Sequence, residues 1–187
     1  DNSLTRALCW SAAWDMLRDA EINATDFIDI ALAGLTGEDD IATVTIIANQ
    51  LVTAVEFYSF PSKRDSARLK VGNAFEVMLA NAKAGSDHQL QFARNFTSFA
   101  SSAEHNDLIK ELLDGKLAGL KVDADLRWTF VIALSERGLM DKESLAAELL
   151  KDNTLTGQLS HATALAAMTT AEAKAETWNS ITTEKIT

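Results

Sequence analysis

Apolar residues recur every three or four positions along almost the whole chain, with polar residues between them. This spacing gathers the apolar side chains on one face of an α-helix, whereas a strand would alternate apolar and polar residues. Alternating runs are scarce. The pattern therefore predicts an all-α protein of about ten helices, at residues 3–20, 25–34, 39–59, 62–83, 87–101, 105–114, 123–137, 142–152, 154–168 and 170–183.

Residues that start and stop helices support several of these boundaries. Pro61 suits the first turn of the fourth helix, where its missing amide hydrogen is not needed. The segments SDHQ at 86–89 and TTAE at 169–172 have the pattern of a capping box, in which a hydroxyl accepts a bond from the third amide. Glycines follow several of the predicted helix ends, as is common at a helix C-terminus.

Helices of this length joined by short turns predict stacked antiparallel pairs of the HEAT or armadillo kind. A weak internal repeat favours this arrangement. SLTRALCWSAAWDMLRDAEINATDFIDIAL and ADLRWTFVIALSERGLMDKESLAAELL both begin near a leucine–arginine element and continue through an apolar helix, a charged turn and a shorter amphipathic helix. An irregular helical bundle remains the alternative. No linker interrupts the pattern, so we expect residues 1–187 to form one helical domain.

The charge, the apolar runs and the cysteine content of the chain limit the classes of partner and compartment that we expect. The net charge of −10 argues against nucleic acid. No run of 18 uninterrupted apolar residues occurs, so we expect no membrane partner. The single cysteine, Cys9, excludes an internal disulfide framework and is typical of a reducing compartment, so we expect a cytoplasmic protein.

Residues 61–100 form the only net basic stretch, with 6 basic and 3 acidic residues. Lys63, Arg64 and Arg68 lead this stretch. Charged runs of this kind usually form a solvated helix face. The alternative is a contact with an acidic neighbouring domain or with a peptide carboxylate.

No motif of an independent enzyme is present. The sequence has no HExxH, GxSxG, Walker or GxGxxG motif, and its three histidines, at 88, 105 and 161, lie far apart. We therefore predict neither a catalytic residue nor a metal ligand in this chain. Cys9 is predicted to be a buried, inert thiol, and the four tryptophans, at 10, 14, 128 and 178, are predicted to pack in the core. Leu4 and Leu8 lie opposite the main apolar stripe of the first helix, which predicts burial of that helix on two faces.

Two arginines lie on otherwise apolar helix faces. Arg6 projects into the stripe of the first helix, and Arg127 lies between the apolar residues of the helix at 123–137. A buried guanidinium needs an anionic or carbonyl partner. Asp123 is one turn before Arg127, the spacing of an ion pair on one helix face. The arginines are therefore either members of buried ion pairs or groups that bind a peptide carboxylate.

Four segments resemble, in order, the C-terminal helical domain of the zinc aminopeptidase N enzymes, especially the actinobacterial type. They are LTRALCWSAAWDMLRDAEI, VDADLRWTFVIAL, LLKDNTLTG and TAEAKAETWNSI. Within them, Arg6 and Ala7 match an Asn/Ser-x-Arg-Ala element of the family. The resemblance extends over nearly the whole chain.

This resemblance implies that the chain is a fragment from the C-terminal part of a larger peptidase, which releases N-terminal amino acids from peptides by means of a zinc-bound water. The HExxH zinc site and the GxMEN loop of that family have no counterpart here, so the resemblance transfers no zinc ligand. It implies a non-catalytic domain that caps the active-site cavity and has the catalytic domain and peptide substrates as partners. A free-standing helical-repeat scaffold for protein–protein interaction is the alternative.

Overall fold

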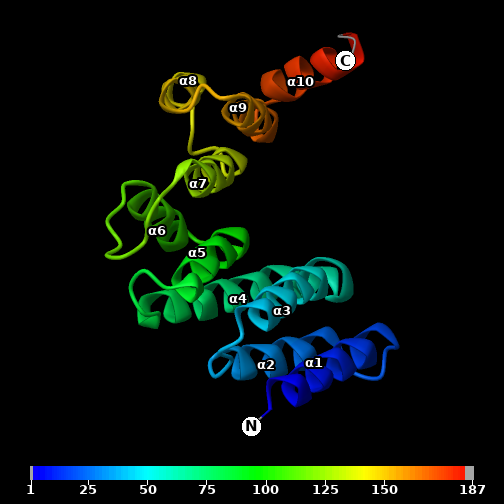
Figure 1. The fold of residues 1–187 in the computed structure, drawn as a ribbon. Helices are drawn as coiled ribbons and strands as arrows, with labels where there is room; N and C mark the ends of the chain where they lie inside the picture. Colours follow the sequence, from blue (N-terminus) through cyan, green and yellow to red (C-terminus); the bar gives the residue numbers. More distant parts are fainter. Residues whose placement is uncertain (1, 184–187) are drawn as a thin grey trace. The chain divides into compact units, whose positions relative to one another are not determined.

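The computed structural model describes residues 2–183, and within them the chain is helical with no strand. Figure 1 shows the helices in chain order. Their bounds are α1 Ser3–Arg18, α2 Ala24–Leu35, α3 Ile41–Thr53, η1 Ala54–Tyr58, α4 Pro61–Asn81, α5 Asp87–Phe99, α6 Ala103–Leu113, α7 Ala124–Glu136, α8 Lys142–Lys151, α9 Leu155–Ala167 and α10 Ala171–Thr183. The predicted all-α stack of helices is confirmed.

The chain divides into two compact units, residues 1–105 and 106–187. In unit 1, α4 packs along α5, and α2 and α3 pack against them. The core of this unit contains completely buried aromatic and aliphatic residues, among them Phe27, Ile47, Leu51, Phe75 and Phe96. Burial of these large side chains supplies most of the driving force for folding of the unit.

Unit 2 is built around α9, which packs against α7, α8 and α10. Its core consists of buried residues from these four helices and the turns next to them: Trp128, Val131, Leu145, Ala164, Met168 and Ala173. The Ser135 hydroxyl donates to the Ala164 carbonyl oxygen at 2.6 Å, so the one hydroxyl buried between α7 and α9 is satisfied.

Of the two predicted side-chain caps, the structure has one at the expected residue. Ser86 accepts from the Gln89 amide at 3.2 Å, although Gln89 bonds back to the Gly85 amide rather than to that of Ser86. The cap of α10 differs from the prediction, because Thr170 and not Thr169 accepts from the Ala173 amide, at 3.2 Å. The helix begins one residue later as a consequence.

The predicted helix at 39–59 is α3 followed by the π-helical turn η1. In length and composition this 18-residue segment, Ile41–Tyr58, could cross a membrane, with a mean hydropathy of 1.3. Val44, Ile47, Leu51 and Val55 of the segment are completely buried inside unit 1. Packing in the core accounts for the apolar character of these four positions, whereas Ile46 and Phe57 of the same segment are exposed.

Candidate functional site

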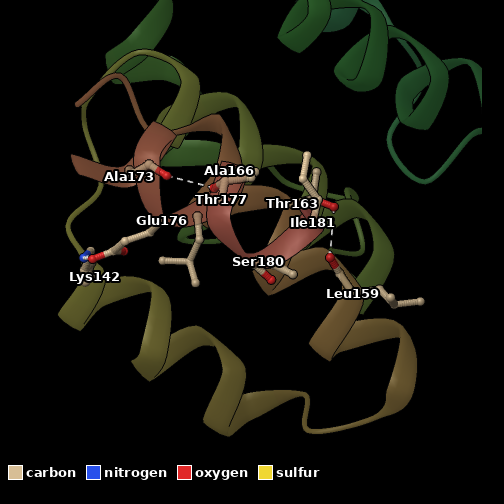
Figure 2. A pocket seen from close by; sticks show the side chains of 11 residues that line it. Lys142, Leu159, Thr163, Ala166, Ala173, Glu176, Thr177, Ser180 and Ile181 are labelled. Carbon is tan, nitrogen blue, oxygen red and sulfur yellow. Dashed lines mark hydrogen bonds and ion pairs between the residues drawn. The ribbon is translucent and has the colours of Figure 1, made fainter. Parts of the chain in front are cut away.

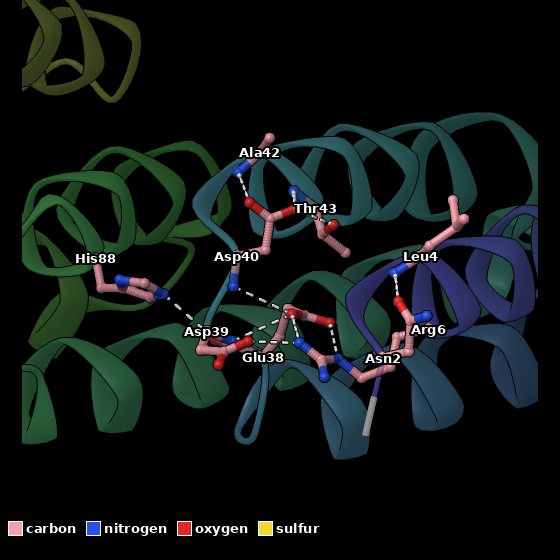
Figure 3. A network of polar contacts seen from close by, with 9 residues as sticks. All are labelled: Asn2, Leu4, Arg6, Glu38, Asp39, Asp40, Ala42, Thr43 and His88. Carbon is pink, nitrogen blue, oxygen red and sulfur yellow. Dashed lines mark hydrogen bonds and ion pairs between the residues drawn. The ribbon is translucent and has the colours of Figure 1, made fainter.

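Arg6 is anchored by carboxylates at the connection between α2 and α3. Its Nε donates to Glu38 Oε2 at 3.1 Å and its Nη2 donates to Glu38 Oε1 at 2.8 Å, while Nη2 also reaches Asp39. Figure 3 shows this network and its surroundings. The Glu38 side chain is 1% exposed and that of Arg6 is 25% exposed. The geometry is the bidentate pairing that guanidinium and carboxylate groups favour when they are buried.

Glu38 is fully occupied by its hydrogen bonds. Besides Arg6, its Oε1 accepts from the backbone amides of Asp39 and Asp40, each at 3.1 Å. The bond from Arg6 outweighs burial, and with the backbone bond it lowers the pKa of Glu38 to about 2. Glu38 is therefore ionised at neutral pH and leaves Arg6 little capacity to bind a further anion.

Trp10 fixes the same corner of unit 1. A Cβ atom added to Gly34 would lie 2.2 Å from the Trp10 ring, so only glycine allows this approach of α1 to α2. The Trp10 indole also makes a minor contribution to the lowered pKa of Glu38. Arg6 and Trp10 together hold the first helix on the second.

The outer side of α1 is exposed. Leu4 and Leu8 are 65% and 63% exposed, so the prediction that the first helix is buried on two faces is wrong. The prediction of a buried thiol is wrong for the same reason, because Cys9 is exposed. This helix packs on α2 and α3 along one side only.

Arg127 in unit 2 has a similar arrangement. Its Nη2 donates to Glu148 Oε1 at 2.8 Å, its Nε donates to Glu148 Oε2, and its Nη1 donates to the Leu113 carbonyl oxygen at 3.2 Å. Burial raises the pKa of Glu148, but the bonds from Arg127 and Lys151 outweigh this effect and leave the pKa below its usual value. The arrangement joins α7 to α8 and to the end of α6.

Asp123 does not form the expected ion pair with Arg127. Its carboxylate accepts from the Leu126 amide at 2.9 Å and caps the N-terminus of α7. An aspartate directly before a helix satisfies a backbone amide that otherwise has no partner in the helix, which is its preferred role there. The anionic partner of Arg127 is Glu148, which lies 21 residues further along the chain.

The predicted basic residues have different surroundings. Arg68 donates to both carboxylate oxygens of Glu56 at 2.7 and 2.8 Å and is also paired with Asp65. Lys63 is exposed, and the described residues offer it no ion pair. Arg64 is half-buried, and its Nε has no hydrogen-bond partner. Of these three residues, Lys63 and Arg64 have no carboxylate partner within residues 2–183, whereas Arg68 has two.

A groove in unit 2 lies between α9 and α10. It has a volume of about 450 Å³, and Figure 2 shows the residues around it. Leu159 and Ile181 are exposed at this groove, and Lys142 of α8 donates to Glu176 at its edge at 2.8 Å. Leu165 and several small or hydroxyl-bearing residues complete the lining.

The histidines have structural surroundings. His105 is 2% exposed; its Nδ1 accepts from the Ser101 amide at 3.2 Å, and its Nε2 therefore carries the proton and donates to Asn73 Oδ1 at 2.8 Å. Within residues 2–183, no group of three or more His, Cys, Asp or Glu side chains could hold a metal ion. His88 contacts the Glu38 carbonyl oxygen, and His161 lies against the Trp128 ring.

Some of the tryptophans pack in the core as predicted, and one does not. Trp128 is buried, and its indole donates to Asp152 Oδ2 at 2.9 Å. Trp14 packs against Phe27, with ring centroids 5.5 Å apart. Trp178 is 65% exposed, so the prediction of a core position is wrong for this residue.

Comparison of the sequence with known proteins assigns the chain to a family. Residues 1–187 match the model of the ERAP1-like C-terminal domain. The chain belongs to this family. It is also 42% identical over 181 residues to Aminopeptidase N of Streptomyces lividans, an alignment that covers 96% of the chain and 21% of the relative. The chain thus spans about a fifth of the length of that protein, and the resemblance to the C-terminal domain of the aminopeptidase N family is confirmed.

Two acidic residues of this C-terminal domain were missed from the sequence. Glu38 and Glu148 complete the two buried arginine pairs, at separations of 32 and 21 residues from their partners. The polar–apolar pattern gives no signal for such distant pairs, because each glutamate lies where a solvated acidic residue would also fit. The need of a buried guanidinium for an anion was the available signal, and it does not specify the partner.

Proposed function

We propose that this domain is a non-catalytic part of a larger zinc-dependent aminopeptidase N, which releases N-terminal amino acids from peptides. In this proposal the domain forms a helical wall over the active-site cavity of the catalytic domain. The wall limits access to the cavity and positions peptide substrates. The observation that carries the proposal is the 42% identity, over 181 residues, to a protein named Aminopeptidase N.

The helical architecture and the ion pairs of the chain support the proposal that it forms a wall of the cavity. Stacked helices form extended surfaces without needing catalytic groups. One arginine–glutamate pair joins α1 to the connection after α2, and the other joins the consecutive helices α7 and α8. Such pairs make each unit rigid, and rigid walls can enclose a chamber that excludes folded proteins.

The zinc of the proposed enzyme is assigned to the catalytic domain. The sequence of this chain has no HExxH motif, and residues 2–183 gather no set of candidate ligands. When bound in the catalytic domain, the ion would activate the water that attacks the peptide bond. The residues of this chain would act only on the shape and access of the cavity.

The substrate range of the full natural enzyme tests the capping role. We expect it to trim a short unstructured peptide and to leave intact a small folded protein that begins with the same residues, because only an extended chain can enter a closed chamber. A destabilised, unfolded variant of that protein is the control and should be trimmed. Equal kcat/KM values for the folded protein and the peptide would contradict a cap.

A further inference from the structure

Two phenylalanines and two cations form an exposed corner where η1 meets α4. Phe57 and Phe60 are 79% and 76% exposed. Lys63 and Arg64 follow on the first turn of α4, three and four residues after Phe60, and therefore lie on the same side of the helix as Phe60. We call Phe57, Phe60, Lys63 and Arg64 the aromatic–basic corner.

The corner is held by hydrogen bonds. The backbone amide and the hydroxyl of Ser59 both donate to the Ala54 carbonyl oxygen, at 2.9 and 3.0 Å. Ser59 itself is buried, and Pro61 begins α4 directly after Phe60. Phe57 thus lies in a hydrogen-bonded π-helical turn, a rare element that is frequent at functional sites, and Phe60 follows this turn directly before α4.

The charges of the corner are unusual within α4. Arg68 is paired with Glu56 and Asp65, and Lys70 is paired with Asp29. Lys63 and Arg64 have no carboxylate partner among the described residues, and the first turn of α4 contains no acidic side chain to balance them. Aromatic rings together with free cations favour a partner that is both apolar and acidic.

A groove opens beside the corner. Phe60 and Lys63 line it, together with Tyr58 and the buried side chains of Leu17 and Ile28, and its volume is about 850 Å³. Glu21 of the turn between α1 and α2 and Asp26 of the first turn of α2 also line it. The groove can accept an apolar side chain next to the Phe60 ring.

We propose that the corner and its groove bind an acidic segment of the same aminopeptidase polypeptide that lies outside residues 1–187. An apolar side chain of that segment enters the groove, and its carboxylates pair with Lys63 and Arg64. The occupant follows from the charge of the corner and from length, since the chain spans only about a fifth of its aminopeptidase relative. The inference rests on the proposed function, because it requires that larger polypeptide.

Site-specific cross-linking in the full natural enzyme tests this contact. Phe60 is replaced with the photoreactive p-benzoylphenylalanine, and the cross-linked peptides are identified by mass spectrometry. We expect a cross-link within one molecule to an acidic peptide outside residues 1–187. We also expect the yield to fall about tenfold when Lys63→Glu and Arg64→Glu are added, because like charges then face each other. Leu155, which is 74% exposed and begins α9, is the matched control position.

Several results would overturn the contact. They are the absence of a cross-link at Phe60, a cross-link inside residues 1–187, a cross-link to a second copy, and a cross-link only to phosphatidylserine vesicles added to the sample. If the charge reversals raise KM for long peptides and leave it unchanged for amino-acid anilides, the corner binds substrate instead.

Radical footprinting of the unmodified enzyme gives a second measurement. Phe57 and Phe60 should show higher protection factors than Leu155, and equal factors would overturn the contact even if the cross-linking variant does not fold. Anilide activity of the same sample separates the two proposals. An active enzyme without the cross-link contradicts the contact alone, whereas an inactive enzyme with the cross-link contradicts the proposed function alone.

Discussion

Replacing Gly157 with alanine is expected to destabilise unit 2 strongly. A Cβ atom at this position would lie 1.9 Å from the backbone oxygen of Asp152 and 2.7 Å from its Oδ2. A backbone oxygen cannot move away from the added Cβ atom by a simple rotation, as a flexible side chain can. Asp152 is also held in place, since Oδ2 accepts from Trp128 and Oδ1 accepts from Thr154. The turn between α8 and α9 must therefore move as a whole, which disturbs the core around Trp128.

The expected cost is about 3 kcal/mol, in the upper range for an added methyl group in a packed site. For a unit of this size, such a loss lowers the melting temperature by roughly 10–20 °C. The measurement is thermal unfolding followed by circular dichroism. The sign of the change in stability is informative. Gly→Ala at an unstrained position normally stabilises a protein by about 0.4–1 kcal/mol, so a loss of stability indicates a steric clash.

Gly37→Ala is the matched control. The nearest atom to a Cβ at Gly37 would be the Gly34 carbonyl oxygen at 4.0 Å, an ordinary contact, so we expect little change in melting temperature. A Gly157→Ala variant as stable as the unmodified chain would contradict the packing of the α8–α9 turn described above.

Replacing Arg6 with alanine is expected to lower the unfolding free energy at pH 7, because it leaves the Glu38 carboxylate, which is 1% exposed, without its cation. Urea unfolding measures this loss. The exposed pair of Arg18 with Asp15, whose side chains are 55% and 57% exposed, is the control. Arg18→Ala should cost less than about 1 kcal/mol.

The pH dependence gives the Arg6 prediction a distinct signature. The folded-state pKa of Glu38, about 2, is well below the usual glutamate value of 4.5. Its pairing therefore stabilises the fold above about pH 4.5, and this stabilisation is lost as the pH falls through about 2. In Arg6→Ala, burial raises the pKa of Glu38, so the variant should lose less stability on acidification. A carboxyl NMR titration with an unchanged pKa in the variant would refute the pairing.

The helices were predictable because local signals specify them. Periodicity, Pro61 and the Ser86 cap each act within a few residues, and the structure confirms them. The cap at Thr170 shows the limit of this reasoning, since two adjacent threonines offer the same hydroxyl and the helix uses the second. Sequence alone does not separate two neighbouring caps of equal chemistry.

The tertiary features were less predictable. Helical periodicity places Leu4 and Leu8 on a face but does not say whether a neighbouring helix covers it, and none does in unit 1. Asp123, one turn before Arg127, was expected to be its ion-pair partner, whereas the fold brings Glu148 to it from α8. Local spacing is informative only where no distant group competes for the same charge.

Aminopeptidase activity on amino-acid anilides tests the central claim most directly. Three samples are compared: this chain, the full natural reading frame, and that frame with residues 1–187 removed. The account predicts chelator-sensitive activity in the full frame, none in this chain and little in the shortened frame. Absence of activity from the full frame would contradict it and would favour a helical scaffold, and full activity without residues 1–187 would show that the enzyme does not need this domain.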